Sequence, residues 1–151
     1  MTDAHPPGRV SCCDSGGSSA ACVFSKALLA RSAVCERAER RSVGERDLIE
    51  CTAAVAHINC STLAALLHER SRFALRLPSP GHPIVHAQAL RLQCGGLAGL
   101  QQALGVERAD VHRMVGLAQQ RHGSLTELPW EVVVGVIKQW PTRRPRQPAV
   151  P

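Results

Sequence analysis

Histidine and cysteine residues give this chain one clear capacity for chemistry, because both are common ligands of zinc and related metals. His57 and Cys60 are three residues apart, which places them at neighbouring positions if the stretch is helical. His86 and Cys94 are further candidate ligands. Cys51 and Cys60 lie on opposite faces of a continuous helix, so a break at His57 is needed to bring them together. A small Cys/His metal-binding accessory protein is therefore one hypothesis, although such residues more often serve packing.

The cysteines also indicate the cellular compartment. The seven residues stand at positions 12, 13, 22, 35, 51, 60 and 94, and no C-x-x-C pair is present. An odd number of cysteines without a disulfide pattern favours reduced thiols in the cytoplasm. The amino terminus has no apolar core of signal-peptide length, and no run of about 18 apolar residues suits a membrane span. We therefore expect a cytoplasmic protein with no membrane partner.

Motifs of catalysis are missing from the sequence. It has no glycine-rich phosphate loop, no G-x-S-x-G and no paired carboxylates in an apolar setting. We therefore expect no enzyme activity and no cofactor.

The composition predicts a mainly α protein. Aromatic residues make up 3% of the 151 residues and no tyrosine is present, whereas apolar residues make up 44%. The apolar and charged positions are filled mostly by good helix formers, Ala, Leu, Arg, Gln and Glu. We expect a small bundle of about six short helices at 25–140, with a possible sub-division near 78–83. We also expect disordered tails at 1–24 and 141–151, of which the second is basic and proline-rich.

Periodicity and end signals place the individual helices. A turn is expected at 57–60 and a break at Gly95–Gly96. Pro129 fits the first turn of the last helix, and Gly105 fits a helix C-cap. The expected helices are 25–41, 45–56, 62–70, 86–94, 97–104, about 108–121 and 130–139.

Residues 72–86 have two interpretations of equal weight. Arg72 to Leu77 alternates with a period of two, and the proline-rich stretch that follows is a strong breaker. One interpretation is a β-hairpin wing that carries Arg72 and Arg76. The other is an ordered, extended linker.

Gly99 to Val115, G-L-Q-Q-A-L-G-V-E-R-A-D-V-H-R-M-V, resembles the helix-turn-helix of DNA-binding domains, including winged helices. In that family the second helix enters the major groove. The resemblance implies that Val111 and Met114 face the core, and that the DNA-binding residues are Arg108, Ala109, His112 and Arg113, with Arg72 and Arg76 added by the wing. Arg108 and Arg113 can donate hydrogen bonds to the edges of guanine bases or to phosphates.

The motif departs from the family pattern at Gln101, where a small residue is usual, and it is acidic at Glu107 and Asp110. Residues 53–67 match the same pattern less well. The net charge of +6 permits an anionic partner. The excess of positive charge, however, lies outside the motif, in the segment that connects the helices before and after 72–86 and in the carboxyl-terminal tail.

Residues 25–67 also resemble half of the amino-terminal helical repeat domain of Clp-type ATPases. The resemblance rests on Ala33, Ala38, Val43, Asp47-Leu48-Ile49 and Leu63-Ala64-Ala65-Leu66-Leu67. It departs from the family at Asp47-Leu48-Ile49, where His-Leu-Leu is usual. It implies an adaptor-like module that binds a protein partner. The leading hypothesis is a DNA-binding regulatory protein that acts as a homodimer, because one short recognition helix buries little surface. The alternative is a helical protein-interaction module without DNA binding.

Overall fold

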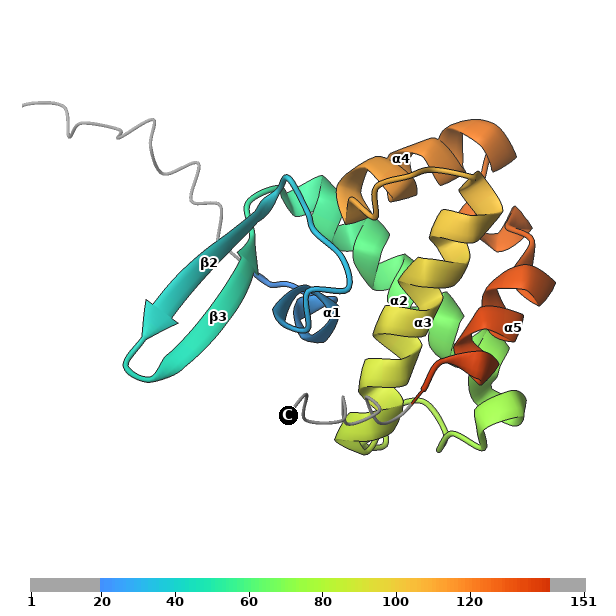
Figure 1. The fold of residues 1–151 in the computed structure, drawn as a ribbon, viewed down its shortest axis with the longest axis horizontal. Helices are drawn as coiled ribbons and strands as arrows, with labels where there is room; N and C mark the ends of the chain where they lie inside the picture. Colours follow the sequence, from blue (N-terminus) through green and yellow to red (C-terminus); the bar gives the residue numbers. More distant parts are fainter. Residues whose placement is uncertain (1–19, 142–151) are drawn as a thin grey trace, which may run out of the picture.

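Helix α3 (His86–Leu104) is the element against which the other helices pack (Figure 1). The computed structural model describes residues 20–141. Helix α5 (Trp130–Gln139) lies along α3 with the most extensive contact, and α2 (Ala54–Leu75), α4 (Val111–His122) and α1 (Ser25–Leu29) cover other parts of it. The side chains of Leu97, Leu100, Met114, Val133 and Ile137 fill the shared core.

Three glycines of α3 explain how closely its neighbours approach. A Cβ atom added at Gly99 would lie 2.8 Å from Cα of Val133, and one at Gly95 would lie 2.9 Å from Cα of Ile137. One at Gly96 would lie 2.7 Å from a methyl group of Leu67. The expected break at Gly95–Gly96 is therefore wrong, because these residues are buried in the helix contacts with α5 and α2.

Helix α2 is longer than the sequence predicted and continues through the expected turn at 57–60. No glycine or proline interrupts it. Ser61 and Thr62 donate hydrogen bonds back to the carbonyl oxygens of His57 and Ile58, so they satisfy groups of the preceding turn instead of capping a new helix. The helix ends at Arg76, whose φ of 52° lies in the left-handed region.

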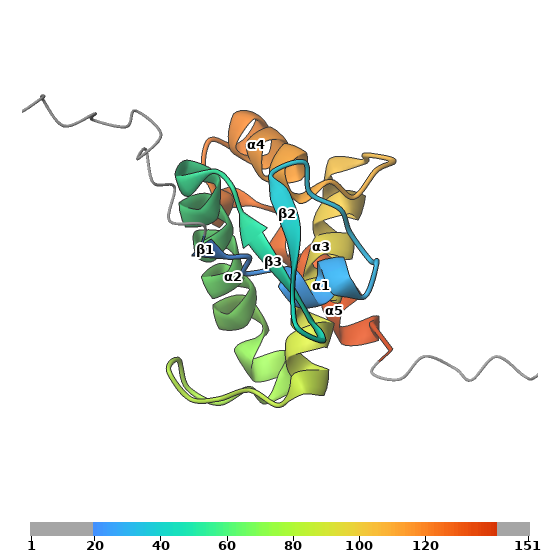
Figure 2. The ribbon, with the colours of Figure 1, turned by 90° about the vertical axis from the view of Figure 1, so that its left-hand side faces the viewer.

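A small antiparallel sheet stands where two helices were expected. Its strands are β1 (Ala20–Ala21), β2 (Ala38–Val43) and β3 (Arg46–Cys51), in the order β1-β3-β2 (Figure 2). Strands β2 and β3 form a hairpin that pairs Ala38 with Cys51 and Val43 with Arg46. Gly44 makes the two-residue turn possible with a φ of 62°. Cross-strand pairing thus overrides the helix preference of the Ala, Glu and Arg residues.

The prediction of a mainly α fold with a hairpin is confirmed, but the hairpin lies at 38–51 and not at 72–86. Arg72 is in the last turn of α2, and residues 76–85 form no strand. Pro78, Pro80 and Pro83 lack the N–H groups that a strand ladder requires. No helix among the described residues is long and apolar enough to cross a membrane.

The expected amino-terminal tail also ends earlier than predicted. Ala20 and Ala21 pair with β3, and the Phe24 side chain is completely buried. Residues 1–19 and 142–151, which hold most of both expected tails, lie outside the described part. A short 3-10 helix, η1 (Leu125–Glu127), joins α4 to α5, whose predicted bounds are confirmed.

The glycine packing gives a stability prediction. Gly99→Ala should lower the free energy of unfolding by about 2 kcal/mol, because the added methyl group meets the backbone of α5 and not a flexible side chain. Chemical denaturation monitored by circular dichroism measures the difference. Gly135→Ala is the matched control, because no atom lies within 4 Å of its added Cβ, and it should leave stability unchanged or raise it. Equal effects of the two substitutions would contradict the packing argument.

Candidate metal centre

Four cysteines from four separate parts of the chain line one small cavity. They are Cys22 after β1, Cys35 before β2, Cys51 at the end of β3 and Cys60 in α2. His57 and His112 also contribute to the wall, and the remaining lining is apolar, from Val23, Ala38, Ala56 and Val111. A cluster of thiol groups in an apolar enclosure is a candidate site for a sulfur-ligated metal.

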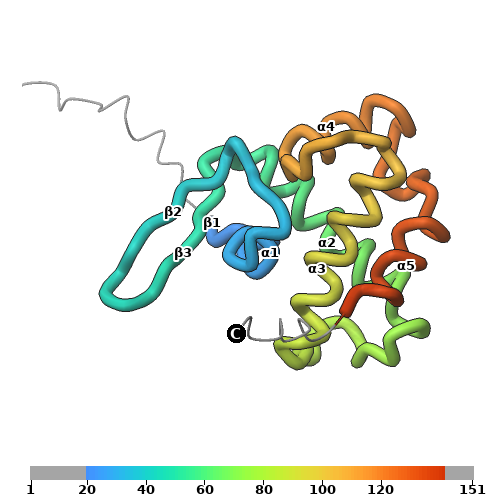
Figure 3. Tube along the Cα trace, in the orientation of Figure 1, coloured from blue at the N-terminus to red at the C-terminus, as the bar shows by residue number. Residues whose placement is uncertain are grey.

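The sheet brings the first three cysteines together. Cys22 follows β1 directly and donates its backbone N–H to the carbonyl oxygen of Ile49, at 2.9 Å. Cys51 ends β3 opposite Ala20 on one side and Ala38 on the other. Strands β1 and β3 and the start of α2 meet at the base of the hairpin (Figure 3). The cavity therefore lies where the sheet joins the helical part of the fold.

The chain turns sharply between Cys51 and the first turn of α2. Thr52 donates its backbone N–H to the carbonyl oxygen of Arg37 at 2.9 Å, and α2 then begins at Ala54. This turn allows Cys51 and Cys60 to face the same cavity. The sequence reasoning identified the need for a break between the two cysteines but placed it at His57.

The thiol groups influence one another electrostatically. Burial raises the pKa of the Cys60 thiol to about 12, and the thiols of Cys35, Cys22 and Cys51 raise it further. Burial also raises the pKa of the Cys22 and Cys35 thiols. Both of these thiols interact with Cys51, and Cys22 also interacts with Cys35. All six pairs among the four thiols are thus close enough to interact.

Backbone N–H groups point toward two of the sulfur atoms. Phe24 donates to the sulfur of Cys22, and both Arg37 and His112 donate to the sulfur of Cys35. These bonds oppose the effect of burial because they lower the pKa of both thiols. Hydrogen bonds of this kind stabilise thiolates and adjust the potentials of sulfur-ligated clusters.

As they stand, the described His, Cys, Asp and Glu side chains include no group of three or more that could hold a metal ion. One zinc ion would hold four sulfur atoms about 3.8 Å from one another, as a tetrahedron with bonds of about 2.3 Å requires. A four-iron cluster holds its cysteine ligands farther apart, because each sulfur binds a different iron, and a two-iron cluster separates two pairs of cysteines, one pair on each iron. The cavity has a volume of about 10 Å³, so the cysteine side chains would have to move apart to hold a cluster.

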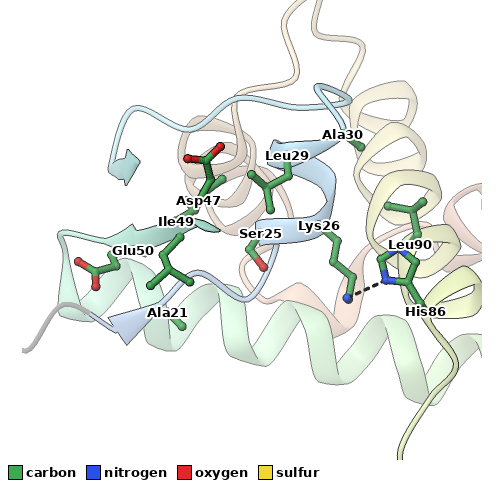
Figure 4. A pocket seen from close by; sticks show the side chains of 11 residues that line it. Ala21, Ser25, Lys26, Leu29, Ala30, Asp47, Ile49, Glu50, His86 and Leu90 are labelled. Carbon is green, nitrogen blue, oxygen red and sulfur yellow. Dashed lines mark hydrogen bonds between the residues drawn. The ribbon is translucent and has the colours of Figure 1, made fainter. Parts of the chain in front are cut away.

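The four metal-ligand candidates chosen from the sequence do not all lie at one site in the structure. His57 and Cys60 lie at the same cavity, and the His57 ring bonds through Nε2 to the carbonyl oxygen of Ala21, at 3.1 Å. His86 lies elsewhere: its Nδ1 is 3.0 Å from Nζ of Lys26, across a hollow of about 520 Å³ formed by α1, β3 and the start of α3 (Figure 4). Cys94 is buried in α3, beside Trp140.

Three cysteines of the cavity were missed as ligands by the sequence reasoning. Cys35 and Cys51 were assigned to helices, and Cys22 was grouped with Cys12 and Cys13 in the tail. Cys12 and Cys13 lie outside the described residues. The absence of short C-x-x-C spacing concealed the group, because its members come from widely separated positions.

The helix-turn-helix candidate is formed by α3 and α4. Gly105 is the left-handed C-cap of α3, Val111 and Met114 are buried, and Arg108 and Arg113 are exposed, all as predicted. The unusual Gln101 has a structural role, because its amide donates hydrogen bonds to the carbonyl oxygens of Val106 and Glu107, at 3.2 and 3.0 Å. It therefore holds the turn between the two helices.

The predicted DNA-binding residues do not form one surface. Arg72 donates a hydrogen bond to the Ser79 hydroxyl, at 2.8 Å, and Arg76 ends α2. Both belong to the carboxyl-terminal end of α2, which lies at the opposite end of the fold from α4 (Figures 1 and 2). Ala109 is half-buried, and its carbonyl oxygen accepts a hydrogen bond from Val34. Arg108, His112 and Arg113 remain together along one hollow on α4.

The outer face of α2 is relevant to the alternative hypothesis, a module that binds a protein partner. Val55, Ile58 and Phe73 lie on one side of this helix with exposed fractions of 71%, 63% and 91%. Binding of a protein partner stays a prediction.

No family model, no characterised protein and no solved structure matches this chain.

The geometry of the α4 start gives a second stability prediction. Asp110 is 4% exposed, and its carboxylate accepts the backbone N–H of Arg113 at 3.1 Å as the N-cap of α4. Asp110→Ala should lower the free energy of unfolding by about 1 kcal/mol, because the first turn loses this acceptor. Thermal unfolding provides the measurement. Glu107→Ala removes an exposed carboxylate from the same turn and should have little effect, so a loss as large as that of Asp110→Ala would exclude the capping role.

Proposed function

We propose that this protein binds an iron–sulfur cluster through Cys22, Cys35, Cys51 and Cys60. The observation that carries the proposal is the arrival of four cysteines, from four separate parts of the chain, at one apolar cavity. Four cysteine thiolates are the common ligand set of both two-iron and four-iron clusters. The proposal departs from the expectation of no cofactor and develops the metal-binding hypothesis with a different set of ligands.

The surroundings of the cavity support this ligand chemistry. The apolar wall limits the access of water, and the N–H groups of Phe24, Arg37 and His112 stabilise negative charge on the ligand sulfurs. Without a cation, burial keeps the Cys60 thiol protonated at neutral pH, since its pKa is about 12. A bound cluster would hold all four groups as thiolates, and its iron would balance their charge.

The role that follows is electron transfer or sensing by the cluster. The His57 ring is held by the bond of its Nε2 to the carbonyl oxygen of Ala21, and it stands beside the proposed ligands. In this role His57 positions β1, and with it Cys22, and does not itself react. DNA binding through Arg72 and Arg76 receives no support, because the end of α2 that carries them lies away from α4 (Figures 1 and 2).

Metal analysis of protein purified without oxygen tests the proposal. We expect iron and acid-labile sulfide in equal amounts, with visible absorption that bleaches on reduction by dithionite. Cys35→Ala, Cys51→Ala and Cys60→Ala should each reduce iron and sulfide to background, because each removes one ligand. Cys94→Ala is the matched control, because it removes a buried thiol outside the cavity, and it should keep the full iron content.

Two results would contradict the proposal. Stoichiometric zinc without sulfide would mean that the cysteines bind a single ion after their side chains rotate. Equal iron contents in the three cavity variants and in Cys94→Ala would mean that the cavity is not the site.

A further inference from the structure

The hollow between α1, β3 and the start of α3 has the size and the lining of a site for a small organic molecule (Figure 4). Its volume is about 520 Å³, within the range of about 300 to 1,000 Å³ that is usual for such sites. Most of its wall is apolar and comes from Leu29, Ala30, Leu48, Ile49 and Leu90. The wall shares no residue with the cysteine cavity, so the two sites are separate.

Contacts with the rest of the fold fix the walls of this hollow. Phe24 and Ala27, at the start of α1 and within it, are completely buried. The backbone N–H of Ala27 also donates to Oε1 of Gln93 in α3, at 3.2 Å. On the other side, β3 is held by β1 through the pairing of Ala21 with Glu50. A ligand therefore meets a preformed hollow, and little free energy is lost in ordering it.

One end of the hollow carries a positive charge. Nζ of Lys26 lies 3.0 Å from Nδ1 of His86, and it forms no ion pair with a carboxylate of residues 20–141. A neutral imidazole with its proton on Nε2 accepts this bond at Nδ1, and the ammonium keeps its other N–H donors for a second partner. The Ser25 hydroxyl also lines the hollow. This end therefore offers a charge and hydrogen-bond donors to an anion.

The two carboxylates of the wall are already paired with arginines of β2. Asp47 accepts a hydrogen bond from Arg40, which lowers the pKa of Asp47. The Glu50 carboxylate lies 3.9 Å from Nη1 of Arg41. No other carboxylate lines the hollow, so the charge of Lys26 stays uncompensated.

We propose that this hollow binds an aliphatic monocarboxylate, with the carboxylate at Lys26 and the chain against Leu29 and Leu48. One lysine matches the single charge of a carboxylate, whereas a phosphate group is usually held by arginine or by several donors. The wall contains leucine, isoleucine and alanine and no aromatic ring, which favours a chain over a stacked ring. Leu29 and Leu48 are 42% and 45% exposed, so the chain covers apolar surface that otherwise contacts water.

Titration with octanoate, followed by the backbone amide shifts in NMR spectra, tests the proposal. We expect saturable binding with a Kd of about 1 mM, the affinity that a ligand of this size allows. The shifts should be concentrated in α1, β3 and the first turn of α3. Octylammonium has the same chain and should bind more than about tenfold more weakly, because it brings a like charge to Lys26. Butyrate should also bind more than about tenfold more weakly, because it buries fewer methylene groups.

Two lysine substitutions form a matched pair. Lys26→Met removes the charge but keeps an apolar side chain of similar reach, and it should raise the Kd for octanoate about tenfold. Lys138→Met removes the same charge from an exposed position of α5 outside the hollow, and it should change the Kd much less. Circular dichroism checks that both variants are folded.

Three results would overturn the proposal. The first is the absence of saturable binding of octanoate, and the second is equal affinity for octanoate and octylammonium. The third is an equal effect of the two lysine substitutions, or amide shifts that map to the exposed face of α2 around Phe73 instead of the hollow. Protein isolated without iron would refute the cluster but would leave this test unaffected, because the two sites share no residue.

Discussion

The enclosure of four thiol groups in one apolar cavity is the constraint on which the rest of this account depends. Each cysteine comes from a different part of the fold, so the short β1 strand, the segment before β2, the end of β3 and the start of α2 must all meet there. Protonated thiols gain little from such a convergence, whereas a sulfur-ligated cluster requires it. The cavity thereby gives a reason for a small sheet beside an otherwise helical protein.

The helical part supplies a rigid wall for this site. Glycines on α3 let the backbone of α5 approach closely, and the resulting core fixes α3 and the turn that Gln101 holds. That turn sets the first residues of α4, whose His112 N–H reaches the sulfur of Cys35. The packing of α3 and α5 and the chemistry of the cavity are therefore connected through the start of α4.

Local signals in the sequence were sufficient for the segment from Gly105 to the end of α5. Pro129 and the apolar stripe defined α5, and Gly105 with Val111 and Met114 defined the turn and inner face of α3 and α4. The hairpin was missed because its residues favour helices individually, and only pairing across Gly44 makes them a sheet. The glycines of α3 were misread as a break because their role depends on a neighbouring helix.

The cysteine cavity was predictable only in part for the same reason. His57 and Cys60 share a local spacing, but Cys22, Cys35 and Cys51 join them only through the register of the sheet and the turn at Thr52. The separation of Arg72 and Arg76 from Arg108 likewise depends on the length of α2, which no local signal fixed.

The most direct test of the account is the X-ray absorption spectrum of the purified protein at the iron edge. With a cluster in the cavity, the spectrum should show iron bound by sulfur alone at about 2.3 Å, with a second shell of neighbouring iron. A spectrum of iron bound by oxygen or nitrogen, or of iron with no neighbouring iron, would contradict the account.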